Sequence, residues 1–320
     1  MNKVSVIIPN YNGEKYLAKC LEALKKQDYP DFDVIIVDNC SEDDSLRVID
    51  ENSKGLETRV ISLDNNYGFA GAVNEGIKAS EAEFVILLNN DAYAGRHFVG
   101  ALVERISRED EIFSAQAMML QYNDRKLIDS AGDYFCALGW GFARGRDCNS
   151  VRFTEECDVF SACAGAAIYR KSAIEQIGYF DETFFAYLED IDLGYRARIY
   201  GYRNVYAPKA KVLHVGSGSS GSRHNEFKVS LSARNAILLM YKNFTPWQKA
   251  VNFIPVVVGV MIKIVYFARK KLAGAYIKGV VSAFSKVKDI EPVENRPEFS
   301  LNYRQIQKEL YRNIIRRLGI

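Results

Sequence analysis

The chain has 320 residues, of which 48 % are hydrophobic and 26 % charged, as in an ordinary folded globular protein. Its net charge of +2 hides a division, because residues 1–225 carry 25 Lys+Arg against 34 Asp+Glu, whereas residues 226–320 carry 17 against 6. The balances of −9 and +11 indicate two parts with different partners, and a basic tail suits an anionic membrane surface or nucleic acid. The six Cys form no C-x-x-C pair, which argues against a zinc or redox motif and favours reduced thiols in a cytosolic protein.

The first half alternates apolar runs with helical patterns. The expected elements are, in chain order, a strand at 4–9, a helix at 14–27, a strand at 32–38, a helix starting near Ser41, a strand at 59–63, a helix at 71–79 and a strand at 83–88. Ser41 with Asp44 three residues later resembles a capping box. Near-continuous apolar strands between helices predict a doubly wound α/β unit, with a parallel sheet covered on both faces.

The pattern changes after this unit. The expected elements are strands at 112–120, 134–144 and 164–169, a helix at about 188–200, and strands at 204–207 and 211–215. The stretch Gly216–Gly221 contains only Gly and Ser and predicts a flexible loop. The chain beyond it is basic and helical in pattern, so we expect an α/β domain at 1–226 and a helical C-terminal region at 227–320.

Polar residues follow the strands of the α/β unit. They form the runs Pro9-Asn-Tyr-Asn12, Asp38-Asn39, Asn65-Asn66-Tyr67-Gly68 and Asn89-Asn90-Asp91. Because the carboxyl ends of such strands share one edge, this concentration indicates a nucleotide crevice, although turn chemistry could explain any single Asn or Asp. Asp38 could accept hydrogen bonds from a pyrimidine ring or a ribose. A dehydrogenase is disfavoured, because the first turn lacks G-x-G-x-x-G.

Three further features carry candidate chemistry. Asp91 follows a strongly apolar strand and could hold a divalent cation against a diphosphate, or it could cap a helix near 95–107. Glu189, Asp190 and Asp192 crowd the first turn of a helix, where a catalytic base or merely a capped helix is expected. His214 precedes the Gly/Ser loop, and this position favours a metal ligand over a structural His.

Several runs agree in order and spacing with a known family. They are V-S-V-I-I-P-N-Y-N, I-I-V-D-N-C-S-E-D-D-S, N-N-Y-G-F-A-G-A-V-N-E-G, L-L-N-N-D-A, G-Y-F-D-E-T-F-F-A-Y-L-E-D-I-D-L-G-Y-R and L-H-V-G. Together they resemble glycosyltransferase family 2, in its rhamnosyltransferase-like branch. The resemblance covers about residues 3–243, including Arg234-Asn235 and Lys242.

The resemblance implies a GT-A fold and a one-step displacement with inversion at the anomeric carbon. It implies a donor pocket made of Pro9, Asn12, Asp38, Asn66, Asn90 and Asp91. It also implies a Mg²⁺ or Mn²⁺ ion on Asp91 and His214, with Asp190 as the catalytic base. The residues expected to bind the acceptor or support the site are Trp140, Gly165, Glu189, Asp192 and Arg196. Asn89 stands where the family's Asp-x-Asp motif begins with Asp, and this departure would hold the metal more weakly.

The basic tail contains a long apolar segment. Ala250–Ile262 has no charged residue, and Arg269-Lys-Lys271 follows shortly after it. This segment is too short for a clear transmembrane helix, so it predicts a helix lying in or dipping into an anionic leaflet, with a buried packing helix as the alternative.

The sequence thus predicts a metal-dependent, inverting glycosyltransferase of cell-surface polysaccharide synthesis, cytoplasmic and peripheral at the inner face of the cell membrane. The expected donor is dTDP-L-rhamnose, or alternatively a UDP-hexose, and the acceptor is a glycan or lipid-linked glycan. A non-catalytic sugar-nucleotide binding protein is disfavoured by the presence of Asp91, Asp190 and His214. No nucleic-acid partner is expected, because no recognised binding motif is present. We expect Asp190 to be the base, because Asp192 can pair with Arg196 one turn further on.

Overall fold

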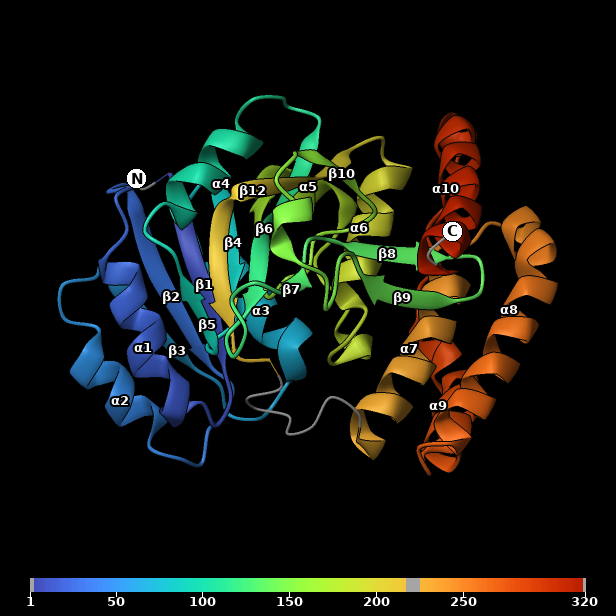
Figure 1. Ribbon diagram of the computed structural model, residues 1–320, viewed down its shortest axis with the longest axis horizontal. Coiled ribbons are helices and arrows are strands. Elements are labelled where there is room, and N and C mark those ends of the chain that lie inside the picture. Colours follow the sequence, from blue (N-terminus) through green and yellow to red (C-terminus); the bar gives the residue numbers. More distant parts are fainter. Residues whose placement is uncertain (1–2, 217–224, 319–320) are drawn as a thin grey trace.

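The computed structural model describes residues 3–216 and 225–318 (Figure 1). The strands are β1 (Val4–Asn10), β2 (Phe32–Asp38), β3 (Thr58–Ser62), β4 (Phe84–Leu88), β5 (Ala92–Ala94), β6 (Ile112–Gln121), β7 (Ile128–Ser130), β8 (Asp133–Cys136), β9 (Trp140–Ala143), β10 (Cys157–Val159), β11 (Ala166–Arg170) and β12 (Arg203–His214). The helices are α1 (Glu14–Lys25), α2 (Ser45–Asn52), α3 (Gly68–Ala79), α4 (Phe98–Ile106), α5 (Lys171–Ile177), α6 (Glu189–Ile199), α7 (Glu226–Asn243), α8 (Pro246–Ala268), α9 (Ala273–Lys286) and α10 (Ser300–Leu318). Apart from Gly216, the predicted Gly/Ser loop lies outside the described residues.

The large sheet is parallel at one end and mixed at the other. Its strand order is β10-β12-β6-β11-β4-β1-β2-β3, with β5 paired to β12 and β7 to β6. β1 runs parallel to β2 and β4, as its near-continuous apolar sequence predicts. The four strands expected in the first half, β3-β2-β1-β4, are all parallel as predicted, and the sheet becomes mixed beyond them because β11 runs antiparallel between β4 and β6. The antiparallel pairing of β11 with β6 follows from the connection between them. This connection contains the β8–β9 hairpin instead of the crossover helix that parallel neighbours usually need.

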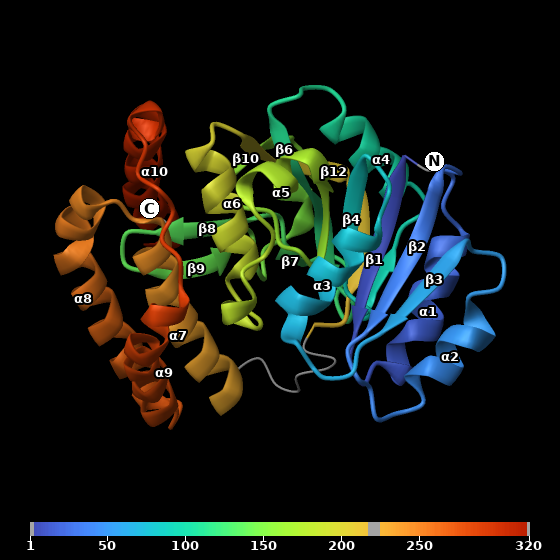
Figure 2. The same ribbon diagram turned by 180° about the vertical axis from the view of Figure 1, so that it is seen from behind.

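Helices cover both faces of the sheet, and the α/β class is therefore confirmed. Val4, Val6 and Ile8 of β1 face one side and Ile7 faces the other, because successive strand side chains alternate. Helices α1, α2 and α4 pack on the first face and α3, α5 and α6 on the second, and Figures 1 and 2 show the sheet between these layers. Because β1, β2 and β4 are parallel, their carboxyl ends lie at one edge of the sheet.

The C-terminal helices α7–α10 gather at one end of the molecule, on the right in Figure 1 and on the left in Figure 2. The β8–β9 hairpin reaches toward them. Asn313 Nδ2 of α10 donates to the carbonyl of Phe135 (2.8 Å), and Trp140 Nε1 donates to the carbonyl of Gly259 on α8 (3.2 Å). One hydrophobic cluster joins the hairpin, α6, α7 and α10, so contacts cross the domain boundary at 226/227, which stays a prediction.

The structure corrects several local expectations. The run 134–144 is a hairpin rather than one strand, because Gly139 adopts a φ of 74° and reverses the chain. Strand β12 is continuous where two strands are expected. A register shift against β6 between Ala207 and Lys211 accommodates Pro208, which cannot donate to a ladder.

The capping box expected for the second helix is also wrong. Helix α2 begins at Ser45, and its N-cap residue, Asp44, makes no side-chain capping bond. Ser41 instead donates its hydroxyl to Asp38 Oδ1 (2.7 Å), so this hydroxyl belongs to the strand-end network described below.

Candidate active site

Asp38 lies in a polar network that joins the ends of three parallel strands. Its Oδ1 accepts a hydrogen bond from Asn10 Nδ2 (2.8 Å), and Asn10 Oδ1 accepts one from Asn90 Nδ2 (2.7 Å). Ser41 donates its backbone N–H to Asp38 Oδ2 (3.0 Å). Asp38 is only 2 % exposed, and with the hydroxyl of Ser41 it accepts three hydrogen bonds, which occupy most of its acceptor positions. The sequence interpretation missed Asn10 as a member of this network, although Asn10 lies inside the Pro9-Asn-Tyr-Asn12 run.

A second set of amides shapes the loops beside this network. Asn39 Nδ2 donates to Asn66 Oδ1 (2.9 Å), and Asn66 Oδ1 also accepts the N–H of Gly68 at the start of α3. Asn12 has a φ of 50° and accepts the N–H of Glu42 (2.8 Å). Pro9 is the half-buried next-to-last residue of β1. The structure thus gathers the expected donor residues at one sheet edge, and their role in donor binding stays a prediction.

Asp91 and His214 meet because a short strand follows β4. β5 pairs antiparallel with the end of β12, and the register sets His214 opposite Ala92, the neighbour of Asp91. His214 Nε2 consequently lies 3.2 Å from Asp91 Oδ1. Helix α4 begins at Phe98 with His97 at its N-cap, so the alternative of Asp91 as a helix cap is wrong. Asn89 also points its amide at His214 Nε2, at 3.5 Å.

A second carboxylate binds the other nitrogen of the His214 ring. Asp129 Oδ2 lies 2.7 Å from His214 Nδ1, and Asp129 Oδ1 pairs with Arg146. Burial alone lowers the pKa of His214, but the hydrogen bonds to Asp129 and Asp91 outweigh burial and raise this pKa to about 10. Sequence reasoning missed Asp129, because nothing in its local pattern distinguishes it.

The Asp91–His214 pair suits a divalent cation. Two ligands in adjacent positions around an ion at about 2.1 Å stand about 3 Å apart, close to the separation found here. A carboxylate oxygen together with an imidazole nitrogen suits a transition-metal ion such as Mn²⁺ better than Mg²⁺, which prefers oxygen ligands alone. Asp129 would keep a proton on Nδ1 and turn Nε2 toward the ion, as second carboxylates do for metal-binding His. Binding would have to displace the Nε2 proton of His214.

Asp190 belongs to a half-buried cluster of two carboxylates and a thiol. Ligand atoms of Asp133, Cys163 and Asp190 all lie within 4.8 Å of one another. Burial, and then the charge of Asp190, raises the pKa of Asp133 to about 8 and raises that of Glu189 well above its usual range. Asp133 and Glu189 therefore hold their protons to higher pH than free carboxyl groups do.

Hydrogen bonding favours Asp190 as the member that ionises. Burial raises its pKa, but backbone N–H groups of Ala164 (3.2 Å) and Ile191 (2.8 Å) donate to its two oxygens and counteract that effect. Glu189 Oε2 is buried and has no hydrogen-bond partner among the described residues. A charge on Asp190 is therefore better stabilised than one on Glu189.

The loop that leads into α6 is held in a strained conformation. Phe185, Tyr187 and Leu188 have φ values of 63°, 70° and 68°, in the left-handed region that non-glycine residues avoid. The buried side chain of Asn235 donates to three carbonyls of this loop, those of residues 184, 186 and 187 (2.7–2.9 Å). The Arg234-Asn235 pattern of α7 thus positions the first turn of α6, a contact that sequence spacing could not reveal.

Asp192 has a different environment from Asp190. It pairs with Arg196 at 3.0 Å, as the i,i+4 spacing predicts, and it also accepts hydrogen bonds from Lys242 (3.0 Å) and Asn243 (2.7 Å). The side chain is fully buried, and the nearby cations of Lys242 and Arg196 outweigh burial and lower its pKa. These contacts favour a structural role for Asp192.

Two consecutive residues connect Asp190 to the strand end that carries Asp91. Ala164 donates to Asp190, and the next residue, Gly165, accepts the backbone N–H of Asn89 (3.0 Å). A Cβ on Gly165 would come within 3.0 Å of the Asn89 amide, so the bare glycine leaves room for it. Trp140, in contrast, contacts α8 through its indole N–H, and its expected acceptor role stays a prediction.

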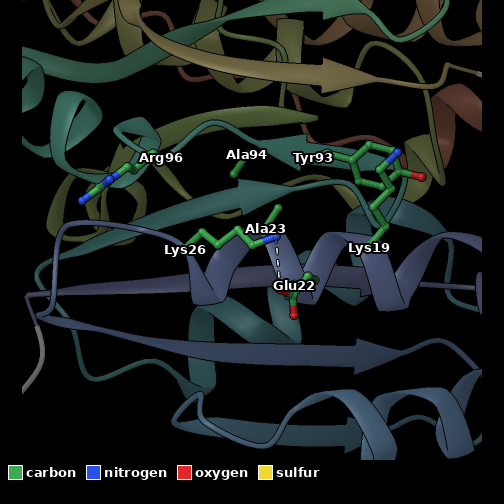
Figure 3. A pocket seen from close by; sticks show the side chains of 7 residues that line it. All are labelled: Lys19, Glu22, Ala23, Lys26, Tyr93, Ala94 and Arg96. Atoms are coloured by element: carbon green, nitrogen blue, oxygen red, sulfur yellow. Dashed lines mark ion pairs between the residues drawn. The ribbon is translucent and has the colours of Figure 1, made fainter.

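An open groove of about 480 Å³ lies elsewhere on the α/β unit (Figure 3). Residues of α1, including Lys19 and Glu22, and residues around β5, including Tyr93 and Arg96, line it. Lys19 Nζ lies 4.6 Å from the centre of the Tyr93 ring. The lining contains none of the predicted site residues, so the groove is distinct from the sheet edge that gathers them.

Comparison with known proteins identifies sequences that are related to this chain. Residues 5–178 match the family model for glycosyl transferase family 2. The poly(ribitol-phosphate) beta-N-acetylglucosaminyltransferase TarS of Staphylococcus aureus is 39 % identical over 99 residues, which are 30 % of this chain and 17 % of TarS. The chain thus matches less than a fifth of that relative's length. The N-acetylglucosaminyl-diphospho-decaprenol L-rhamnosyltransferase of Mycobacterium tuberculosis is 27 % identical over 239 residues, 68 % of this chain and 77 % of the relative.

Solved structures show the same fold. TarS residues 1–349 in complex with UDP-GlcNAc align with a TM-score of 0.59 at 20 % identity, over 99 % of this chain and 92 % of the TarS chain. The mannosyltransferase PcManGT from Pyrobaculum calidifontis, in complex with GDP-Man and Mn²⁺, aligns with a TM-score of 0.57 at 14 % identity, over 98 % and 81 %. These likenesses show the GT-A fold, and the family model covers more than half of the chain. The chain therefore belongs to glycosyl transferase family 2.

Proposed function

We propose that the protein is a metal-dependent, inverting glycosyltransferase that moves a sugar from a nucleotide-sugar to a glycan or lipid-linked glycan in cell-surface polysaccharide synthesis. One observation carries the proposal. A carboxylate with two backbone N–H donors, Asp190, is connected through Ala164 and Gly165 to the site where Asp91 meets His214. This connection supports an acceptor base beside a leaving-group site, as a single displacement requires.

In this proposal a residue of the chain takes the proton of the acceptor hydroxyl, and the site sets the direction of attack. The acceptor hydroxyl oxygen attacks the anomeric carbon on the face opposite the diphosphate, the bond from that carbon to the diphosphate oxygen breaks, and Asp190 takes the hydroxyl proton. The configuration inverts and a nucleoside diphosphate leaves. A divalent cation on Asp91 and His214 would neutralise the negative charge that develops on the diphosphate.

For the donor we propose dTDP-L-rhamnose first and a UDP-hexose second. The rhamnosyltransferase relative supports the first choice, and the TarS complex with UDP-GlcNAc supports the second. A non-catalytic sugar-nucleotide binding protein is the rival function. It would not need the two N–H donors that stabilise a charge on Asp190.

Release of nucleoside diphosphate from a panel of nucleotide-sugars, with and without Mn²⁺, tests the proposal. We expect release from one donor class, abolished by EDTA. Asp190→Asn should lower turnover about 10²- to 10⁴-fold with donor binding retained, because it removes only the proton acceptor. Asp91→Ala should lose both turnover and donor binding. Asp50→Asn, a change at an exposed α2 carboxylate, is the matched control.

Two results would contradict the assignment. Full turnover in excess EDTA would exclude a requirement for the cation. Near-normal turnover of Asp190→Asn with an inactive Glu189→Gln would make Glu189 the base instead of Asp190. Binding of a donor by calorimetry, without release or transfer under any condition, would favour the non-catalytic alternative.

We also propose a cytoplasmic location, peripheral at the inner face of the cell membrane. The six cysteines are free thiols, which suits a reducing compartment. The basic C-terminal region would bring the site close to a lipid-linked acceptor.

A further inference from the structure

Helix α8 presents an apolar face that the described part of the chain leaves exposed. The helix is long and apolar enough to cross a bilayer, yet only 17 % of its most apolar window is buried. It lies at the outer end of the molecule (Figure 1). Helices α8 and α9 contact each other, and we call their exposed apolar side chains the α8–α9 face: Phe253, Ile254, Val257, Val258, Met261, Ile262, Val265, Ile277, Val281 and Phe284. The sequence alternative of a buried packing helix is therefore wrong.

The opposite side of α8 is bound to the protein along its length. Near its start, Asn252 and Gln307 of α10 exchange two side-chain hydrogen bonds (2.9 and 2.8 Å). In its middle, Gly259 packs so closely on the β8–β9 turn that a Cβ would lie 2.1 Å from the Leu138 carbonyl oxygen. Near its end, the ring of Phe267 stacks on that of Tyr276 of α9.

These attachments decide how the helix can meet a membrane. A spanning orientation would break them, or it would carry α9 and α10 with their buried amides into the hydrocarbon, where unsatisfied polar groups cost several kcal/mol each. With the attachments kept, the α8–α9 face can only lie against the bilayer surface.

The charges beside this face match an anionic surface. Residues 227–288 contain no Asp or Glu. Exposed Arg269, Lys270 and Lys271 follow α8 directly, and exposed Lys278 lies on α9. Two aromatic residues of the kind found at membrane interfaces, Trp247 and Tyr266, are exposed near the two ends of α8. A second copy of the chain fits less well, because a two-fold contact would bring like charges together.

We propose that the α8–α9 face docks flat on an anionic bilayer, with its apolar side chains at the acyl boundary and the basic residues at the phosphates. This inference rests on the proposed membrane location and deepens it. The β8–β9 hairpin connects the two sites, because its turn packs on Gly259 and its first residue, Asp133, belongs to the cluster of Asp190. A four-residue strand is about 13 Å long and a helix is about 10 Å thick, so docking would hold the base at a fixed distance from the lipid surface that is set by the hairpin and α8 together.

Flotation of the full chain with lipid vesicles tests the proposal. We expect recovery with vesicles of phosphatidylglycerol and phosphatidylcholine, much less with phosphatidylcholine alone, and complete release by alkaline carbonate. Ile254→Glu and Met261→Glu, at side chains 65 % and 62 % exposed, should lose most of the flotation. Val151→Glu, at a 72 % exposed position on the α/β unit, is the matched control and should float like the wild type.

Several outcomes would overturn the proposal. They are no flotation of the wild type, equal flotation of all variants, resistance to carbonate, or a dimer in solution that Ile254→Glu dissociates. Thermal unfolding checks that the variants fold. Donor release measured without vesicles separates this inference from the enzymatic one, because either can fail while the other stands.

Discussion

Replacing Asp192 with Asn should destabilise the fold and leave the proposed base in place. The Asp192 carboxylate is fully buried and accepts hydrogen bonds from Arg196, Lys242 and Asn243, all at 2.7–3.0 Å. Asn preserves the shape and removes the negative charge between two cations. Breaking a buried ion pair costs about 3–5 kcal/mol.

The structure indicates the lower end of this range. Lys242 keeps a second carboxylate, Asp181, at 2.7 Å, and Arg196 still donates to the carbonyls of Ile177 and Gly178. We therefore expect a loss of about 3 kcal/mol in the free energy of unfolding. At about 2 °C per kcal/mol for a chain of this size, the melting temperature should fall by about 6 °C.

The pH dependence gives a further check. The folded-state pKa of Asp192 lies below its usual value, so its stabilising contribution is present above the unfolded pKa of about 3.9 and is lost as pH falls through the folded pKa. The difference between wild type and Asp192→Asn should thus be the same at pH 7 and at pH 5. Urea unfolding followed by circular dichroism measures it, with Asp50→Asn as the control. An unchanged urea midpoint would refute the stabilising network, and normal stability with turnover as low as that of Asp190→Asn would make Asp192 the base.

Three further predictions concern residues around the site. Asp129→Asn should weaken Mn²⁺ binding about 10- to 100-fold by calorimetry, because His214 loses the carboxylate that orients its ring, and unchanged affinity would count against that contact. Asn235→Ala should lower turnover, and it should lower the free energy of unfolding measured in urea by about 1–3 kcal/mol, because three loop carbonyls lose their donor. Normal turnover would show that the loop keeps its conformation without Asn235. Burial raises the folded pKa of Asp133 to about 8 from an ordinary 3.8, so its contribution to stability should fall as pH rises between these values, and the stability of Asp133→Asn relative to wild type should rise over this range in urea titrations at several pH values.

The sequence by itself determined the local features of this protein. Apolar runs and helical periodicity predicted the strand–helix alternation of the α/β unit, because both patterns follow from which side chains must face the core. Asp38 ends one strand and Asp91 follows another. Their positions predicted that both lie at the same edge of the sheet, because parallel strands end together. The i,i+4 pair of Asp192 and Arg196 depended on helix geometry alone.

Only the tertiary structure decided contacts between residues distant in the chain. Asp91 meets His214 because β5 pairs with β12, and Asp129 reaches the same ring from β7. Asn235 of α7 holds a loop about fifty residues earlier in the chain. Strand order, register and helix docking create these contacts, and such long-range pairings leave no periodic signal in the sequence. The exposure of α8 is of the same kind, because apolar composition alone suits a buried helix as well as a membrane-docking one, and only the packing of its neighbours shows which face remains free.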